Sequence, residues 1–196
     1  MKTTMKAILV ATTLSLALTL TAGAAIPIWL ASGPVTATFH VGTLPTTVWW
    51  HDGYYGGSQD YGDWTVGNNT GSYIDGDGTF IWLRNVGDWA QTTIPGPHTM
   101  EVIAFGSDSN DGCVEIWVDG NSVAYVDSWS NPGVYWYIKV VGLPLAPHTI
   151  KVMAVGETTQ MPPGNGNDDV SLDGAGTLDG SQAAELGTWT SLKSLY

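Results

Sequence analysis

The chain has almost no cysteine and few basic residues. Its 196 residues include one cysteine, Cys113, and only six lysines and arginines against 18 aspartates and glutamates. A single cysteine excludes an internal disulfide. We expect Cys113 to be a buried small hydrophobe at the foot of a strand. Because an acidic surface repels the phosphate backbone, the charge balance excludes nucleic acid as a favoured partner.

The only long hydrophobic run lies at the N-terminus, where Lys2 and Lys6 precede the apolar stretch Ala7 to Leu20. The small residues Ala22, Gly23 and Ala24 then form a cleavage pattern. This order predicts a secretory signal peptide over residues 1–24 and therefore a secreted, extracellular protein. The mature chain would carry four basic residues against 18 acidic ones, a net charge of −14. Such acidity favours either cation binding or solubility.

Helical hydrophobic stripes are also missing, whereas turn residues recur throughout the chain. Glycine, proline and Asp-Gly pairs separate short alternating runs, the pattern expected of an all-β fold, an antiparallel β-sandwich or jelly roll. We expect strands near Val35–Val41, Thr47–Trp50, Thr79–Val86, Ala90–Ile94, Thr99–Phe105, Val114–Val118, Ser122–Val126, Tyr135–Val141, Thr149–Val155 and Val170–Leu172.

Two stretches 50 residues apart nearly repeat each other: PHTMEVIAFG at Pro97–Gly106 and PHTIKVMAVG at Pro147–Gly156. Each begins at a Pro-His turn, alternates with a period of two, and is followed by a second strand that ends in Asp-Gly. The alternation predicts that one face carries Met100, Val102 and Ala104 in the first copy, and that the same face carries Ile150, Val152 and Ala154 in the second.

The composition divides the chain into four parts. After the signal peptide, residues 25–45 would be a lead-in or an extra strand, and residues 46–174 would form the sandwich. Residues 175–196 are rich in glycine, serine and threonine and would be a tail or an edge strand.

Aromatic residues are biased toward those with a polar group. Ten tryptophans and eight tyrosines stand against three phenylalanines. The densest segment, Trp49 to Trp64, holds six aromatics among aspartates and glycines, so we expect a loop. Rings pack on the C–H faces of a sugar, while carboxylates and amides bind its hydroxyls, so the segment fits a carbohydrate site. A well-packed loop that closes the end of the sandwich is the alternative.

A second aromatic segment, Trp129 to Tyr137, reads WSNPGVYWY. Strand alternation sends Trp136 and Ile138 to one side and Tyr135 and Tyr137 to the other, and one of these sides must be core. Trp129 or Tyr135 is therefore a candidate binding ring, although such rings serve cores as well as interfaces.

The segment PPGNGNDD at Pro162–Asp169 places Asn165, Asn167, Asp168 and Asp169 at a glycine-rich turn. Carboxylate and amide oxygens in such a turn suit calcium, and an Asx-type turn with solvated charges is the alternative.

No catalytic motif is recognisable. The four histidines are dispersed, and His98 and His148 occupy equivalent turns, so we expect both to be structural. The carboxylate pair Asp60 and Asp63 does not stand out from ordinary loop polarity. We therefore expect the protein not to be an enzyme.

From about Gly78 onward the chain resembles carbohydrate-binding modules of families 6 and 35, which have a galactose-binding-like jelly roll. The matching segments occur in the family's order: GTFIWLRNVGDWAQTTI, VEIWVDGNSVAYV, PGVYWYIKVVGLPLAPHTIKVMAVG and GNDDVSL. They cover about 95 residues, roughly half of the chain.

This resemblance implies a sugar site at the loops of one sandwich edge, made of two facing rings and an asparagine before the last strand. It carries these roles to Trp129 or Tyr135, to Asn167, and to one ring from Tyr54, Tyr55 or Tyr61. It also implies a structural calcium with Asp169 as a ligand. The family's second ligand, an early glutamate, has no counterpart before Glu101, so Asp52 or Asp60 would have to replace it.

The sequence thus predicts a secreted, non-catalytic protein that binds a polysaccharide or glycan. The alternative is a structural subunit of an extracellular surface, matrix or filament, which would associate with itself through strand edges and aromatic patches.

Overall fold

The computed structural model describes residues 23–43, 45, 48–53, 64–68, 73–74 and 80–177, with the main chain alone for 49–53 and 73–74. These ranges contain strands and no helix, so no described helix could cross a membrane. The strands are β1 (Ile26–Leu30), β2 (Thr36–Val41), β3 (Trp49–Gly53), β4 (Thr65–Gly67), β5 (Tyr73–Ile74), β6 (Ile81–Leu83), β7 (Trp89–Ser107), β8 (Cys113–Val118), β9 (Asn121–Asp127), β10 (Val134–Gly156) and β11 (Val170–Thr177). Every pair of strands is antiparallel, which confirms the predicted all-β sandwich.

Two long strands, β7 and β10, belong to both layers of the sandwich. Their partners change halfway along, so the pairings define two sheets. Sheet A has the order β1, β9, β8, the second half of β10, the first half of β7, and β4. Sheet B has the order β2, the first half of β10, the second half of β7, and β11, which pairs with both β6 and β3, while β5 extends β6.

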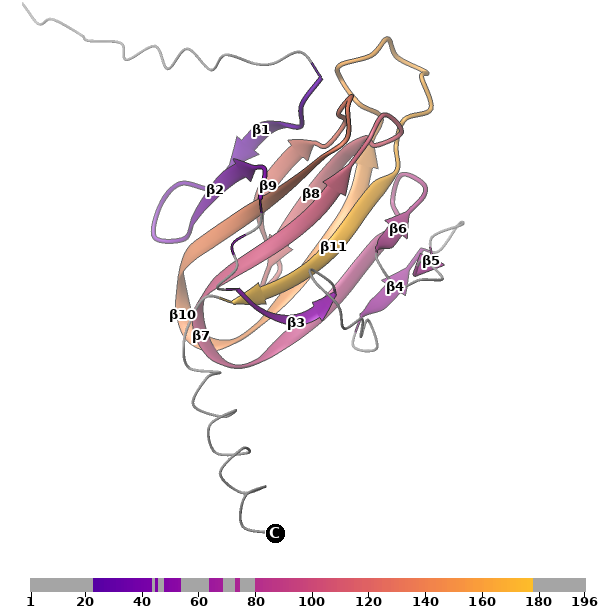
Figure 1. Cartoon of the computed structure of the whole chain (residues 1–196). Coiled ribbons are helices and arrows are strands. Elements are labelled where there is room, and N and C mark those ends of the chain that lie inside the picture. The colour runs from indigo at the N-terminus through magenta and orange to yellow at the C-terminus, as the bar shows by residue number, and fades with distance from the viewer. Residues whose placement is uncertain are drawn as a thin grey trace, which may run out of the picture.

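Both long strands turn a corner at the same end of the sandwich (Figure 1). The corners contain the two Pro-His-Thr segments, and the register between β7 and β10 shifts there. The rings of His98 and His148 meet edge to face, with centroids 4.9 Å apart. His98 binds Glu101, and His148 Nδ1 lies 2.6 Å from Asp119 Oδ2, so the two histidines hold the corners, as predicted.

The core lies between the two sheets. Trp136 on β10 is fully buried, and its ring stacks on Phe105 of β7 with centroids 4.1 Å apart. From sheet A the alternate residues of β8 and of the second half of β10 face inward, including Ile116, Ile150 and Val152. Trp136 and Ile138 lie on the opposite side of β10 from Tyr135, as predicted, and the structure shows that the core side is that of Trp136 and Ile138.

The two repeat copies do not present the same face, contrary to the prediction. In the second copy Ile150, Val152 and Ala154 belong to the core. In the first copy Ile103 and Phe105 belong to the core between the sheets, whereas Met100, Val102 and Ala104 lie on the opposite face of sheet B, where Val102 and Ala104 are also fully buried. The reason is local: buried His98 binds buried Glu101 three residues later, and this irregular step shifts the alternation by one residue.

The two Asp-Gly pairs also differ. Asp119 and Gly120 both have positive φ, 51° and 74°, and form the two-residue turn between β8 and β9. Asp173 and Gly174 lie within β11 at a register shift, so the prediction that this strand ends at the Asp-Gly pair is wrong. The strand continues to Thr177 because β3 and β7 pair with it on both sides.

The N-terminal region adds two strands. β1 pairs with β9 and β2 pairs with β10, so residues 26–30 and 36–41 complete one edge of each sheet. The predicted signal peptide lies outside the described residues except at its last two positions. The carbonyl of Gly23 accepts a hydrogen bond from Asn131 N, and that of Ala24 accepts one from Gln160 Nε2.

Candidate functional site

The loops at the end of the sandwich opposite the corners are tied together by buried polar groups. Asp127, at the end of β9, is fully buried and accepts hydrogen bonds from Trp129 N, from Thr158 Oγ1, and from the main chain and hydroxyl of Thr159. Cys113 is also buried, as predicted, and its Sγ donates to Glu157 O at 3.3 Å. These hydrogen bonds hold the loops in place beside the outer face of sheet B.

A cleft of about 250 Å³ lies on the outer face of sheet B, next to these loops. Its base is one row of residues in register across four strands: Tyr135 on β10, Gly106 on β7, Ser171 on β11 and Trp82 on β6. The side chains at the two ends of this row are large, and the two in the middle are small. Since neighbouring strands are about 4.8 Å apart, the two large side chains stand roughly 14 Å apart at their backbones, with a trough between them.

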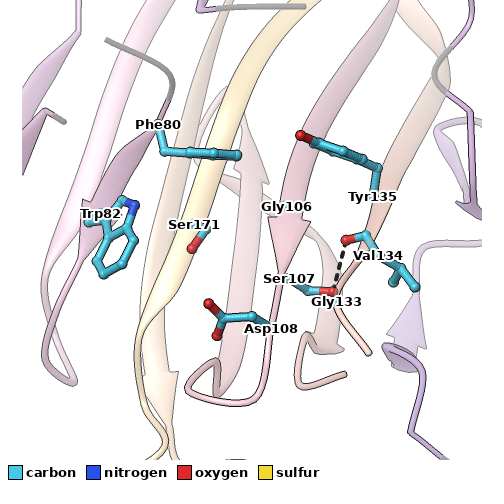
Figure 2. Close-up of a pocket in the computed structure, with 9 residues that line it drawn as sticks. All are labelled: Phe80, Trp82, Gly106, Ser107, Asp108, Gly133, Val134, Tyr135 and Ser171. Atoms are coloured by element: carbon cyan, nitrogen blue, oxygen red, sulfur yellow. Dashed lines mark hydrogen bonds between the residues drawn. The ribbon is translucent and has the colours of Figure 1, made fainter. Parts of the chain in front are cut away.

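The ring of Phe80 covers part of this trough. Figure 2 shows the Phe80 ring on the β11 side of Gly106 and the Tyr135 ring on the β10 side. Gly106 is necessary for this arrangement, because a Cβ at this position would come within 2.8 Å of the Phe80 ring. Tyr135 is 44% exposed, so part of its side chain faces solvent. Two aromatic rings thus flank a floor made of glycine and serine.

Hydroxyl and carboxylate groups lie at the loop side of the cleft. Ser107 donates to Val134 O at 3.1 Å, and its Oγ lies 2.8 Å from Ser130 Oγ. Ser171 donates to Asp111 Oδ1 at 3.4 Å. Asp108 also lines the cleft, as Figure 2 shows. These oxygens retain lone pairs, so the wall of the cleft offers acceptors to hydroxyl groups of a ligand.

Three carboxyl groups, those of Asp108, Asp111 and Asp169, lie close to one another beside the cleft. Burial raises the pKa of Asp111 well above its ordinary value, and the neighbouring charge of Asp108 adds to the shift. Burial also raises the pKa of Asp169, while the Arg84 guanidinium, whose Nε lies 3.6 Å from Asp169 Oδ2, acts in the opposite direction. Arg84 also sits 5.2 Å from the centroid of the Trp82 ring. Arg84 therefore contacts both Asp169 and Trp82, which lines the cleft.

Of the predicted rings near β10, the structure brings Tyr135 into the cleft and leaves Trp129 out. Trp129 Nε1 donates to Ser109 O at 3.1 Å, which holds the ring against the neighbouring loop. Asn167 is on the loop before β11, and its carbonyl accepts a hydrogen bond from Thr158 N. Neither Trp129 nor Asn167 is among the residues that line the cleft.

Tyr54, Tyr55, Tyr61 and Asp60 lie outside the described residues, so their predicted roles stay predictions. Asp52 is on β3, where its main chain pairs with Ala175, six positions beyond Asp169 along β11. At about 3.3 Å per residue, the two backbones are roughly 20 Å apart, so the structure does not bring this predicted pair of metal ligands together.

Calcium therefore stays a prediction that rests on Asp169 and its acidic neighbours. Within the described part of the chain, no group of three or more histidine, cysteine, aspartate or glutamate side chains is placed to hold a metal ion.

Sequence reasoning missed Phe80, Trp82, Gly106 and Ser171. A signal for the first two exists: in the run Phe80–Leu83 the fully buried Ile81 and Leu83 alternate with aromatics, which places both rings on the outer face. Gly106 and Ser171 carry no such signal, because only the register of β7 with β11 brings them beside each other.

Comparisons with known proteins give weak similarities. No family model matches the chain, and no curated protein matches it. Among solved structures, a xanthan lyase from Paenibacillus aligns with 57% of this chain at 12% identity and a TM-score of 0.36. A family two carbohydrate esterase from Cellvibrio japonicus aligns with 73% at 12% identity and a TM-score of 0.30. The chain spans only 11% and 34% of the lengths of these two proteins.

Proposed function

We propose that the protein binds a neutral polysaccharide or glycan through the cleft on sheet B and does not transform it. The observation that carries this proposal is the row Tyr135, Gly106, Ser171 and Trp82, with the Phe80 ring over its floor. The row has aromatic side chains at both ends and small residues between them, and the Phe80 ring covers part of the floor that the small residues form.

The chemistry of the lining suits a sugar ring. An apolar C–H face of a pyranose packs on an aromatic ring, and its hydroxyls need oxygen partners at the edges. The cleft provides the rings of Phe80 and Tyr135, the hydroxyls of Ser107 and Ser171, and the carboxylate of Asp108. A neutral ligand is favoured over an anionic one, because the chain carries a formal charge of −12.

The expected affinity is modest. A ring contact contributes about 1 kcal/mol beyond the area that it buries. Two rings and a few hydrogen bonds are enough for about 4–8 kcal/mol, which corresponds to a dissociation constant between millimolar and micromolar. Such binding is useful when a polymer offers many equivalent sites.

The proposal that the protein does not act as a serine hydrolase rests on the hydrogen bonds made by the two serine hydroxyls of the cleft. Ser107 bonds Ser130 and Val134, and Ser171 bonds Asp111, so among the described residues neither hydroxyl is bonded to a histidine base. Activation of a serine nucleophile needs such a base within hydrogen-bond reach.

Affinity electrophoresis through gels that contain neutral soluble polysaccharides tests the proposal. β-Glucan, galactomannan and arabinoxylan form a suitable panel. We expect at least one of them to retard the wild-type protein, and Tyr135→Ala to weaken this retardation about fivefold or more. Val41→Ala is a matched control, because Val41 is also an exposed apolar residue of sheet B, 50% exposed, and does not line the cleft.

Retardation of Tyr135→Ala equal to that of the wild type would show that the cleft is not the sugar site. Release of reducing sugar or of acyl groups from a retained polysaccharide would contradict the non-catalytic part of the proposal.

A further inference from the structure

The outer face of sheet A also carries a row of large side chains in register. Trp29 on β1 pairs with Tyr125 on β9, Tyr125 with Glu115 on β8, Glu115 with Met153 on β10, and Met153 with Trp89 on β7. Three aromatics thus lie along one line perpendicular to the strands. This face is on the other side of the core from the sheet B cleft.

Only one end of this row is open. At the β7 end, the ammonium group of Lys151 lies 5.0 Å from the centroid of the Trp89 ring and 5.7 Å from that of Trp117, so a cation already occupies the space over these rings. At the β1 end, Trp29 is 47% exposed and borders a groove of about 460 Å³, lined also by Glu115, Ser122, Tyr125 and Val155.

The polar groups in this groove are ordered. Ser122 donates a hydrogen bond to Glu115 Oε1 at 2.6 Å, which fixes the carboxylate and leaves its other oxygen as an acceptor. Burial, together with a hydrogen bond to the Cys113 thiol, raises the pKa of Tyr125 to about 12. The phenol therefore keeps its proton at neutral pH. The groove combines two aromatic faces with a positioned carboxylate and a hydroxyl, and its lining includes no cationic side chain.

We propose that the groove formed by Trp29, Tyr125, Glu115 and Ser122 is a second saccharide-binding site, for a neutral sugar unit with free hydroxyls. The exposed indole provides a stacking face, and the free oxygen of Glu115 accepts a hydrogen bond from a sugar hydroxyl. An anionic ligand is disfavoured by Glu115 itself.

If the sheet B cleft binds polysaccharide as proposed, a second site changes what the protein can do. With one site on each outer face, a single molecule would bind two segments of polysaccharide at once and cross-link separate chains. Two weak sites on one molecule raise the overall affinity for a polymer well above that of either site.

Four variants distinguish the two sites: Trp29→Ala, Glu115→Gln, Tyr135→Ala and the double variant Trp29→Ala/Tyr135→Ala. The same gels with β-glucan, galactomannan or arabinoxylan provide the readout. We expect each single alanine variant to lose about fivefold in retardation and the double variant to lose all of it. Ile28→Ala is the matched control, because Ile28 is 46% exposed on the same strand but does not line the groove.

Glu115→Gln keeps the shape of the side chain and leaves β1 intact, so it tests the site even if Trp29→Ala loosens the edge strand. We expect Glu115→Gln to weaken retardation severalfold at an unchanged melting temperature. The wild type, but neither single alanine variant, should also make a solution of the retained polysaccharide turbid.

The possible outcomes separate the two proposals. If Trp29→Ala and Glu115→Gln behave as the wild type while Tyr135→Ala loses all binding, the groove is not a site and the proposed function stands. If Tyr135→Ala behaves as the wild type while Trp29→Ala loses all binding, the groove stands and the sheet B cleft is wrong. Failure of every polysaccharide to retard the wild type would overturn both proposals.

Discussion

The two copies of the repeat begin with the same three residues and end in opposite surroundings. Residue 101 in the first copy is a fully buried glutamate, whereas the equivalent residue 151 is a lysine on the outer face, over two tryptophan rings. Position 103 is a core isoleucine, whereas position 153 is a methionine on the outer face of sheet A. A one-residue shift in alternation exchanges the two faces of a strand completely.

This shift determines which residues of β7 face the candidate site. Because Glu101, Ile103 and Phe105 face inward, Val102, Ala104 and Gly106 face outward, and Gly106 becomes the floor of the cleft beside Tyr135. Without the irregular step at His98, the bulkier Phe105 would lie on the outer face instead. The corner at one end of the sandwich therefore determines the surface near the other end.

The largest effect is expected from exchanging the charges at the two equivalent positions. Glu101→Lys removes the carboxylate that binds His98 and buries an ammonium beside this ring in the core, and we expect a loss of more than about 4 kcal/mol of unfolding free energy. Lys151→Glu removes the contacts with Trp89 and Trp117 and should cost only about 1 kcal/mol. Urea unfolding followed by tryptophan fluorescence measures both.

The same pair of variants tests the out-of-phase assignment directly. If the two copies were in phase, residues 101 and 151 would lie on the same kind of face, and the two substitutions would have similar costs.

The second prediction uses the apolar positions. Ile150→Ala and Ile103→Ala remove fully buried core side chains and should each cost about 2–5 kcal/mol. The equivalent residues Met100 and Met153 are half-buried on the outer faces, so Met100→Ala and Met153→Ala should cost about 1 kcal/mol or less. Equal losses for Met100→Ala and Ile150→Ala in urea titrations would contradict the shift.

The sequence predicts the positions of the strands better than it predicts which face of each strand is buried. Alternation and turn residues are local signals, so they locate β2, β8 and β9 within a few residues. They do not show that β7 and β10 each join two of the predicted strands into one. The His98–Glu101 contact joins residues only three positions apart, but it forms because the corner buries both side chains, and no hydrophobic pattern in the sequence indicates that the alternation breaks between them.

The site was predictable only in part for the same reason. Alternation separates Tyr135 from Trp136 and Ile138 but does not say which side is core, and the structure buries Trp136 and Ile138 and exposes Tyr135. The trough between Tyr135 and Trp82 depends on the register of four strands, whose order the sequence does not reveal. The structure does not bring the predicted metal ligands Asp52 and Asp169 together, because Asp52 pairs with Ala175, six residues after Asp169.

A third prediction concerns the strand that pairs with the first copy. Asp173, on β11, is 2% exposed, and burial raises its pKa from 3.8 to about 7. The folded protein then holds a proton that the unfolded chain releases, so stability is highest below about pH 4 and falls as the pH rises to about 7. At about 1.4 kcal/mol per pKa unit, this loss is on the order of 2–4 kcal/mol.

Asp173→Asn removes the titrating group at nearly the same size. We expect the variant to be more stable than the wild type at both pH values, and by a larger margin at pH 8 than at pH 5, as measured by urea unfolding. A difference between the two proteins that is the same at pH 5 and pH 8 would show that Asp173 does not titrate in this range.

The smallest effect on stability should come from the two glycines that end the repeat copies. A Cβ at Gly106 would lie 2.8 Å from the Phe80 ring, whereas a Cβ at Gly156 would have no neighbour within 4 Å. The Phe80 ring covers part of the cleft floor and also borders the open space of the cleft, so it moves aside in Gly106→Ala, and we expect a change in unfolding free energy below about 1 kcal/mol. Retardation by the polysaccharide should nevertheless fall severalfold, because the displaced ring no longer flanks the floor. Gly156→Ala is the matched control and should change neither quantity. In a Phe80→Ala background the effect of Gly106→Ala on retardation should disappear, since the two substitutions act on one contact; an undiminished effect there would mean that Gly106 does not shape the cleft through Phe80.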